Sequence, residues 1–226
     1  MQDSNLLRAE AAQDILAAAG LLYRRGLVNT YEGNISRRLG GTLLITPSAV
    51  NKEALTAADL VEVDLATGKT VAAAPGRRAS SELRLHLCCY RSRPDIAGVA
   101  HAHPPYATAF ALRREPIETK GYPEMILLYN RVPVCRYGRP GTEEINAEVP
   151  DALRSYDQFL LANHGLVTVG GSAMEAVYRL EGIESIARVL KLAREMGGET
   201  ALPDEECAEI ETMYRARRNG TNDTGR

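Results

Sequence analysis

The chain has 226 residues, of which 45% are hydrophobic and 25% charged, and its formal net charge is −2. This length and composition are average for a globular protein and suffice for one large domain or two small ones, each with a buried core. The small net charge argues against nucleic acid or an anionic membrane as a partner, and no apolar run approaches the length of a bilayer span.

The first part of the chain predicts a helix followed by short strands. Residues 6–25 place leucine and isoleucine broadly on one side and carry charges throughout, which is typical of an amphipathic helix and not of a signal peptide. A strand is predicted within 41–48, where a proline stops it. Residues 56–71 predict a helical turn and two strands joined by a hairpin at Thr67-Gly68.

The middle of the chain alternates helix and strand. Segment 80–95 has apolar residues at helical spacing, with Ser80 or Ser81 expected as the N-cap residue. Residues 97–105 predict a strand that two prolines end, and residues 105–114 return to a helix.

The last part of the chain predicts an extended segment at 125–137 and a helix that starts at Thr142. Residues 158–171 predict two strands joined by a turn, and residues 172–197 the longest helix, which two glycines end. Because helices and strands intermix without a repeat or a linker, we expect one α/β domain over 1–215 and a polar, disordered tail at 216–226.

The four cysteines show no C-x-x-C spacing and predict reduced thiols in a cytoplasmic protein, most of them filling the core. They are Cys88, Cys89, Cys135 and Cys207.

The stretch VAHAHPPYATAF, residues 99–110, places His101 and His103 two residues apart on a predicted strand. Residues i and i+2 of a strand face the same way, so both imidazoles project from one face beside the loop that the prolines start. Two neutral imidazoles that converge in this way suit a divalent transition metal, most often zinc.

Two further residues could complete such a site. His164 follows a predicted strand and precedes a glycine, and Glu82 lies in the first turn of a predicted helix. Three histidines and one displaceable carboxylate form a sound four-coordinate site. His86, one helical turn beyond Glu82, could compete as a ligand, but a partly buried histidine hydrogen-bonded to a neighbour is the favoured interpretation.

Three short segments have the composition of an anion-binding site, because hydroxyl groups and a helix N-terminus attract phosphate. They are the turn with Gly33, Asn34 and Ser36, the strand end with Thr46 and Ser48, and the serine pair Ser80 and Ser81.

Together, the ordered motifs EGNIS, LITPS, SSELRLH, VAHAHPPYATAF and LLANHGLV resemble the class II aldolase and adducin-head family, within it the fuculose-phosphate aldolase-like enzymes. The resemblance covers about residues 10–195. It implies a single α/β/α layered domain with a central, mainly antiparallel sheet, assembled as a homotetramer whose active sites lie at subunit interfaces.

The resemblance also assigns roles to residues. It implies a metal held by His101, His103 and His164, usually zinc, with manganese and cobalt as alternatives. Glu82 is implied as a metal ligand at rest and as the proton-transfer base. The residues implied to hold the substrate phosphate are Gly33, Asn34, Thr46, Ser48, Ser80 and Ser81.

Two tyrosines are implied as well, Tyr122 as an acid that reaches in from a neighbouring subunit and Tyr214 as a mobile C-terminal residue. The chain departs from the family pattern where Ala49 replaces a glycine, where Ala79 replaces a proline, and where Tyr31-Glu32 replace small residues. If position 49 requires positive φ, an alanine there is strained.

The reaction implied is metal-dependent cleavage of a small ketose 1-phosphate into dihydroxyacetone phosphate and an aldehyde, through an enediolate. Alternatives within the family are a sugar-phosphate epimerase, dehydratase or decarboxylase, and a 5-deoxypentulose-phosphate aldolase. A non-catalytic binding module of the adducin type is disfavoured, because all four expected metal ligands are present.

Overall fold

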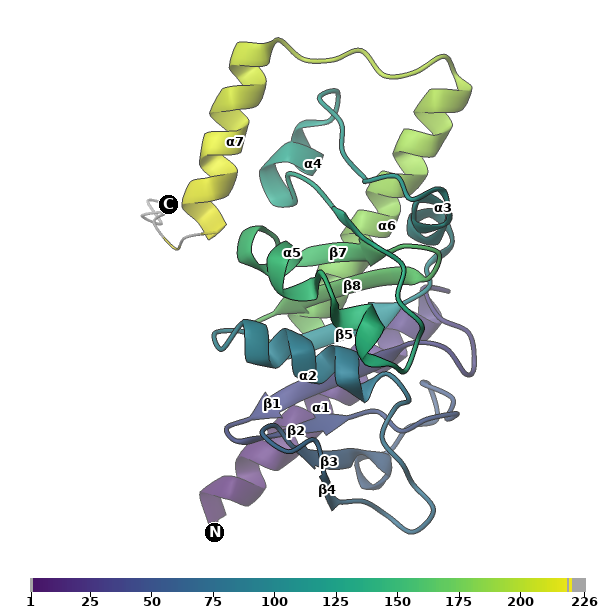
Figure 1. Ribbon diagram of the computed structural model, residues 1–226, viewed down its shortest axis with the longest axis vertical. Coiled ribbons are helices and arrows are strands. Elements are labelled where there is room, and N and C mark those ends of the chain that lie inside the picture. Colours follow the sequence, from purple (N-terminus) through teal and green to yellow (C-terminus); the bar gives the residue numbers. More distant parts are fainter. Residues whose placement is uncertain (1, 219, 221–226) are drawn as a thin grey trace.

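The fold is built on one eight-stranded sheet, seen in a computed structural model that describes residues 2–218 and 220 (Figure 1). The strand order is β4-β3-β2-β1-β5-β8-β7-β6, and all neighbours pair antiparallel except β6 and β7. The strands are β1 (Asn34–Leu39), β2 (Thr42–Ile45), β3 (Val61–Asp64), β4 (Thr70–Ala72), β5 (Gly98–Ala102), β6 (Val134–Cys135), β7 (Gln158–Leu161) and β8 (Gly165–Gly170).

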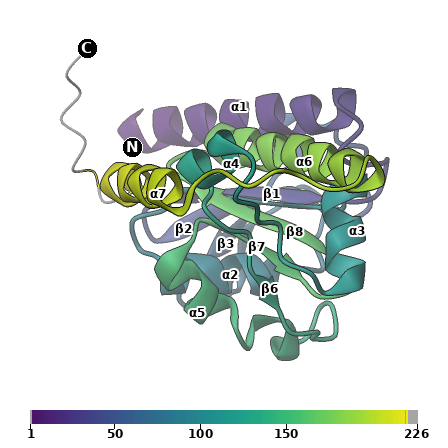
Figure 2. The same cartoon turned by 90° about the horizontal axis from the view of Figure 1, so that it is seen from above.

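Helices cover both faces of this sheet, with α1 and α6 on one side and α2 and α5 on the other (Figure 2). The helices are α1 (Gln2–Arg24), α2 (Leu83–Ser92), α3 (Pro105–Arg113), α4 (Pro123–Leu128), α5 (Val149–Ser155), α6 (Ala173–Glu195) and α7 (Asp204–Arg218). Two 3₁₀ turns lie at Ala57–Asp59 and Glu143–Asn146. The predicted α/β class and the mainly antiparallel sheet are confirmed. No helix in the described part of the chain has the length and apolar composition to cross a bilayer.

The alternation of side chains along the strands gives each face its own core. In β2, Leu44 packs with the helices α1 and α6, whereas Leu43 and Ile45 pack with α2 and α5. Each of these three leucine and isoleucine side chains is 0% exposed. The sheet is therefore buried on both sides, and polar residues on its inner strands lie inside the protein.

Carboxylates of helices α1 and α6 accept hydrogen bonds at the N-termini of neighbouring helices. Asp14 of α1 accepts hydrogen bonds from the backbone N–H groups of Ala173 and Met174, at 2.8 and 3.0 Å, where α6 begins. Glu184 of α6 accepts from the N–H groups of Tyr106 and Ala107 at 2.9 and 2.7 Å, where α3 begins. Because free N–H groups at a helix start need acceptors, these contacts hold both helices in place.

The extended segment predicted at 125–137 is wrong over its first part. Residues Pro123–Leu128 form α4, and only Val134–Cys135 pair as a strand. Pro123 occupies the first turn of the helix, where a proline is well tolerated, and a short apolar run does not by itself distinguish helix from strand.

Two predicted helix boundaries also differ. Helix α2 begins at Leu83 with Glu82 at the N-cap position, so neither Ser80 nor Ser81 is the N-cap. Thr142 does cap a helical segment, but that segment is the turn Glu143–Asn146, and α5 follows separately.

The last helix extends slightly into the segment that was predicted to be a disordered tail. Helix α7 continues to Arg218, so residues 216–218 of the expected tail are helical. Residues 219 and 221–226 of that tail lie outside the described residues. The four cysteines are free, and three of them are buried, as predicted.

Candidate metal centre

The candidate site lies where β5 and the turn between β7 and β8 end at the same edge of the sheet. His101 is in β5, His103 follows the strand directly, and His164 occupies the turn just before β8. Because β5 and β8 are neighbours in the sheet, the three imidazoles meet, although more than 60 residues separate His101 from His164 in the chain.

The three rings form a nearly regular triangle. Their centroids lie 4.9 Å apart for His101 and His103, 4.8 Å for His101 and His164, and 4.9 Å for His103 and His164. One nitrogen of each ring lies within 4.8 Å of the others, a spacing that can hold a metal ion. The predicted convergence of the three histidines is confirmed.

Gly165 is what permits this close approach. A Cβ atom at that position would lie 2.6 Å from the carbonyl oxygen of Ala102 and 2.6 Å from Cδ2 of His103. Contacts this short do not occur, so any side chain at residue 165 would displace the histidines.

Hydrogen bonding and burial set the orientation of His101 and shift the pKa values of His101 and His103 in opposite directions. Nδ1 of His101 lies 2.9 Å from the carbonyl oxygen of Leu166 and donates to it, which leaves Nε2 facing the cluster, 3.1 Å from Nε2 of His103. Burial and the neighbouring His101 and His164 lower the pKa of His103 to about 4, so this ring is neutral at pH 7. Burial lowers the pKa of His101 as well, but the charge and hydrogen bond of Glu82 outweigh burial and raise that pKa.

Glu82 closes the cluster from the helix side. Its Oε2 lies 2.9 Å from Nε2 of His101, and its Oε1 lies 3.2 Å from Nε2 of His164. Burial raises the pKa of Glu82, but the charges and hydrogen bonds of these two histidines prevail and hold that pKa far below its usual range. Three imidazole nitrogens and an ionised carboxylate thus meet at one point, and this donor set fits a divalent cation such as zinc.

The three predicted anion-binding segments also lie side by side. A bridge pairs Pro47 with Ala79, the N–H of Ser80 donates to the carbonyl of Thr46 at 3.2 Å, and the N–H of Ile35 donates to the Thr46 hydroxyl at 3.2 Å. Ala49 adopts φ 55°, so the requirement for positive φ at this position is confirmed.

Most side chains of these segments are engaged within the chain. The hydroxyl of Ser48 donates to the carbonyl of Ala79 at 3.0 Å, and that of Ser80 accepts from the N–H of Glu82 at 3.3 Å. The amide of Asn34 donates to Glu82 at 3.1 Å. Among the predicted phosphate-binding side chains, that of Ser81 is exposed.

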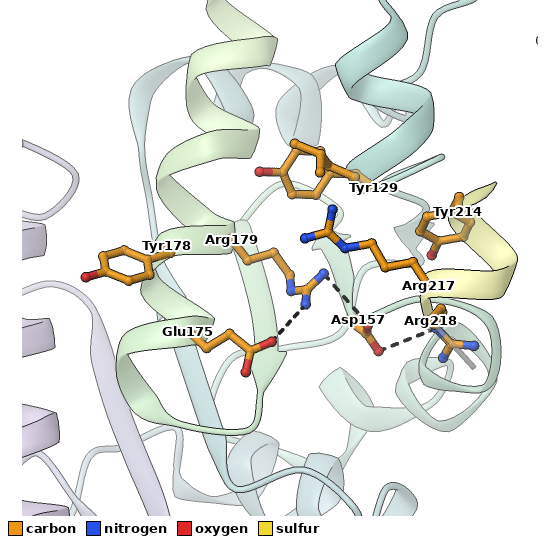
Figure 3. A pocket seen from close by; sticks show the side chains of 9 residues that line it. Tyr129, Asp157, Glu175, Tyr178, Arg179, Tyr214, Arg217 and Arg218 are labelled. Atoms are coloured by element: carbon orange, nitrogen blue, oxygen red, sulfur yellow. Dashed lines mark hydrogen bonds and ion pairs between the residues drawn. The ribbon is translucent and has the colours of Figure 1, made fainter. Parts of the chain in front are cut away.

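Neither candidate tyrosine joins the cluster within one chain. Tyr122 is the N-cap residue of α4 and packs on the core, and it has no hydrogen bond to the histidines or Glu82 in the described part of the chain. Tyr214 of α7 is 6% exposed and lines a different cavity of about 390 Å³, together with Arg179 and Arg217 (Figure 3). None of the three histidines lines that cavity.

Two residues with a structural part in the site, Glu32 and Glu184, were not predicted. Glu32 places its Oε2 3.6 Å from Nδ1 of His103, and Glu184 anchors the start of α3 just beyond the histidine pair. His86 is fully buried and hydrogen-bonded, as the favoured interpretation had it, but it contacts Asn34 and not the histidine cluster. A glutamate within the apolar stripe of a long helix, as at residue 184, is a sequence signal that could have been noticed.

Comparison with known proteins agrees with this geometry. Residues 13–190 match the profile of the class II aldolase and adducin N-terminal domain family. The chain is 31% identical over 182 residues to L-fuculose phosphate aldolase of Escherichia coli O6:H1, which covers 80% of this chain and 83% of that protein. It is 32% identical over 189 residues to 3-oxo-tetronate 4-phosphate decarboxylase of Pectobacterium atrosepticum, covering 81% and 84%.

A solved L-fuculose 1-phosphate aldolase superposes with a TM-score of 0.82 at 29% identity, over 91% of this chain and 96% of that one. The fold and the three-histidine cluster define an α/β protein with a candidate metal centre at the sheet edge. The chain belongs to the class II aldolase and adducin N-terminal domain family.

Proposed function

We propose that the protein is a metal-dependent aldolase that reversibly cleaves a small ketose 1-phosphate into dihydroxyacetone phosphate and an aldehyde. The observation that carries this proposal is the meeting of three imidazoles with the ionised Glu82 at one partly buried point. The similarity to fuculose-phosphate aldolases supports the substrate class.

His101, His103 and His164 would hold the metal, for which zinc is the first candidate and manganese and cobalt are alternatives. A divalent cation in this site supplies Lewis acidity, which stabilises negative charge on a substrate oxygen when the C3–C4 bond breaks. Neutral imidazoles suit this task, and the low pKa of His103, about 4, keeps that ligand available at neutral pH.

Glu82 would move the proton. In the synthetic direction its ionised carboxylate takes a proton from C3 of the donor, and in the cleavage direction the protonated acid gives that proton back to C3. Its carboxylate is ionised at neutral pH, because the neighbouring histidines hold its pKa low. So weak a base would act only after substrate displaces it from the histidines and a bound cation acidifies the C3 proton.

The substrate phosphate would bind where the three hydroxyl-rich segments adjoin, on Gly33, Asn34, Thr46, Ser48, Ser80 and Ser81. The exposed hydroxyl of Ser81 is the group best placed to donate to an incoming anion.

Tyr122 would exchange a proton with the oxygen that becomes the aldehyde, reaching the site from a neighbouring subunit of a homotetramer. The four free thiols support a cytoplasmic location.

A sugar-phosphate decarboxylase is the second candidate, because the similarity to 3-oxo-tetronate 4-phosphate decarboxylase equals that to the aldolases. An epimerase is less favoured, since the resemblance implies aspartate in epimerases where this chain has Glu82. A dehydratase and a 5-deoxypentulose-phosphate aldolase remain further alternatives.

The test is a turnover screen of ketose 1-phosphates and 3-oxo acid phosphates with zinc-loaded protein, scoring dihydroxyacetone phosphate and carbon dioxide separately. The matched control is Glu82→Gln, which keeps the size and the hydrogen-bonding shape of residue 82 but cannot take up a proton. Release of dihydroxyacetone phosphate that chelation abolishes and zinc restores supports the proposal. Full turnover of the metal-free protein, or an epimer without cleavage, contradicts it.

A further inference from the structure

A continuous chain of buried hydrogen bonds leads from Glu82 into the protein core. Nδ2 of Asn34 donates to Oε2 of Glu82 at 3.1 Å, and Oδ1 of Asn34 lies 2.5 Å from Nε2 of His86. Nδ1 of His86 lies 2.6 Å from the hydroxyl of Ser36, which lies 2.9 Å from the hydroxyl of Tyr90. His86 and Ser36 are 0% exposed, Tyr90 1% and Asn34 5%.

Matching periodicities of helix and strand build this chain. Glu82, His86 and Tyr90 follow one another at intervals of four residues along α2, and Asn34 and Ser36 are two residues apart on β1. Four helical residues rise about 6 Å, and two strand residues rise about 6.8 Å. The side chains from the helix and those from the strand therefore have nearly the same spacing, and they alternate along the series of hydrogen bonds.

The orientation of the Asn34 amide sets the direction of the hydrogen bonds in this series. Nδ2 of Asn34 donates to Glu82, so the carbonyl oxygen of Asn34 faces His86. Nε2 of His86 must then carry the proton, and Nδ1 must accept from the hydroxyl of Ser36. The Ser36 oxygen in turn accepts from the hydroxyl of Tyr90, because that hydroxyl lies 2.9 Å from Ser36 and 3.4 Å from its other acceptor, the carbonyl oxygen of Ala97.

We propose that His86 is a positioning residue, which acts through Asn34 to fix the orientation of the Glu82 carboxylate, so that Oε1 is the oxygen that takes up the proton of the reaction. This inference rests on the proposed function and adds the groups that orient its base. Oε1 is the oxygen that faces His164, 3.2 Å from its Nε2, whereas Asn34 contacts Oε2.

His86 contributes by fixing the Asn34 amide. Without the Nε2–H donor, the carbonyl of Asn34 loses its buried partner, and the amide can rotate by 180° to seek another. A carbonyl oxygen facing Glu82 would repel the carboxylate, so its orientation would no longer be unique. Burial, followed by the nearby His101, lowers the pKa of His86 to about 3, so the ring stays neutral over the working pH range, as this arrangement requires.

The first test reads the tautomer of His86 directly, by long-range ¹H–¹⁵N NMR of the zinc-loaded protein labelled at histidine. His86→Gln identifies the resonances of residue 86 among the four histidines. We expect Nε2 to be protonated and Nδ1 to be bare, with no change from pH 6 to 8. A proton on Nδ1 would reverse the direction of the hydrogen bonds between Asn34, His86 and Ser36, and it would overturn the proposal.

The second test separates kcat from KM. In His86→Leu, both hydrogen bonds of residue 86 are lost. We expect kcat to fall about 10- to 100-fold, the range typical of residues that orient a ligating side chain through hydrogen bonds. Zinc stoichiometry and KM should stay within about twofold, because the three ligating imidazoles are unchanged. His86→Gln offers an N–H donor and an oxygen acceptor, and it should recover most of kcat.

Leu153→Ala serves as the matched control for stability. Leu153 is 0% exposed and belongs to the same core cluster as the apolar residues of α2, but it has no part in the hydrogen-bonded chain. If Leu153→Ala loses as much kcat as His86→Leu at an equal loss of melting temperature, the role of His86 is only structural and the proposal falls. If His86→Leu does not fold, the tautomer and the kcat of His86→Gln decide between the same two outcomes.

The two proposals fail in different ways. A protein that turns over no ketose phosphate removes the aldolase function, but the NMR experiment needs no substrate and still determines the direction of the chain. An active aldolase with His86 protonated on Nδ1 keeps the function and removes the positioning role.

Discussion

Acidification should destabilise the protein through His86, and His86→Gln should remove that dependence. Burial, followed by repulsion from His101, lowers the pKa of His86 from 6.5 to about 3 in the folded protein. An unfolded chain binds the proton at about pH 6.5. Between these two values the unfolded state takes up a proton that the folded state does not.

The sign and size of the effect follow from this difference. The stabilisation is fully present above pH 6.5 and is lost as the pH falls toward 3, by about 1.4 kcal/mol per pH unit. Over the whole interval the loss amounts to roughly 5 kcal/mol, which is comparable to the entire stability of many domains. Glutamine retains both hydrogen bonds but does not titrate.

The assay is urea unfolding of the metal-free protein in EDTA, from pH 7 to pH 4, for the wild type and for His86→Gln. We expect the free energy of unfolding of the wild type to fall more steeply, so that the difference between the two proteins changes by about 1.4 kcal/mol per pH unit below pH 6. Parallel pH profiles would refute the reasoning, because they would show that His86 binds protons equally in both states.

Three further predictions concern the site and its surroundings. In Gly165→Ala the new Cβ would lie 2.6 Å from Cδ2 of His103. We therefore expect the free energy of unfolding to fall by about 1–3 kcal/mol and zinc binding to weaken at least about 10-fold. An unchanged zinc affinity, measured by calorimetry, would contradict this prediction. Glu32→Gln should weaken zinc binding by no more than about 10-fold, since its carboxylate lies 3.6 Å from Nδ1 of His103 and is 43% exposed, and a tighter complex would contradict the assigned role. Ala49 has a strained φ of 55°, which glycine adopts without strain. Relief of this strain should outweigh the added conformational entropy of the unfolded chain by about 0.5 kcal/mol, so Ala49→Gly should raise the melting temperature by about 1–2 °C. A lower melting temperature would show that the turn is not strained.

The metal ligands were predictable because local patterns determine where they lie. His101 and His103 alternate with alanines on a strand that prolines end, so the period of two and the stop were both visible in the sequence. The turn around His164 was equally clear, because a glycine follows it between two apolar runs. The ordered motifs then related these separate segments to one family.

Features that depend on tertiary contacts were not predictable in the same way. The segment Met125–Leu128 is apolar and short, and a helix and a buried strand fit it equally well until Pro123 is recognised as a helix start. The role of Asn34 is another example, since its amide contacts Glu82, a residue 48 positions away in the chain. Its place next to a glycine turn indicated phosphate binding, and nothing local indicated the carboxylate.

The register of the sheet explains why the whole arrangement depends on few positions. In β1 and β5, Asn34 pairs with His101 and Ser36 pairs with Val99, so these four side chains lie on the face that α2 covers. A slip of one residue would turn Asn34 and His101 toward α1 and leave Glu82 opposite apolar side chains. The apolar alternation that buries Val99 and Ile35 on opposite faces of the sheet therefore also fixes where the metal ligands and the base meet. The site is thus specified by the packing of both cores, and substitutions that shift this register should remove metal binding and stability together.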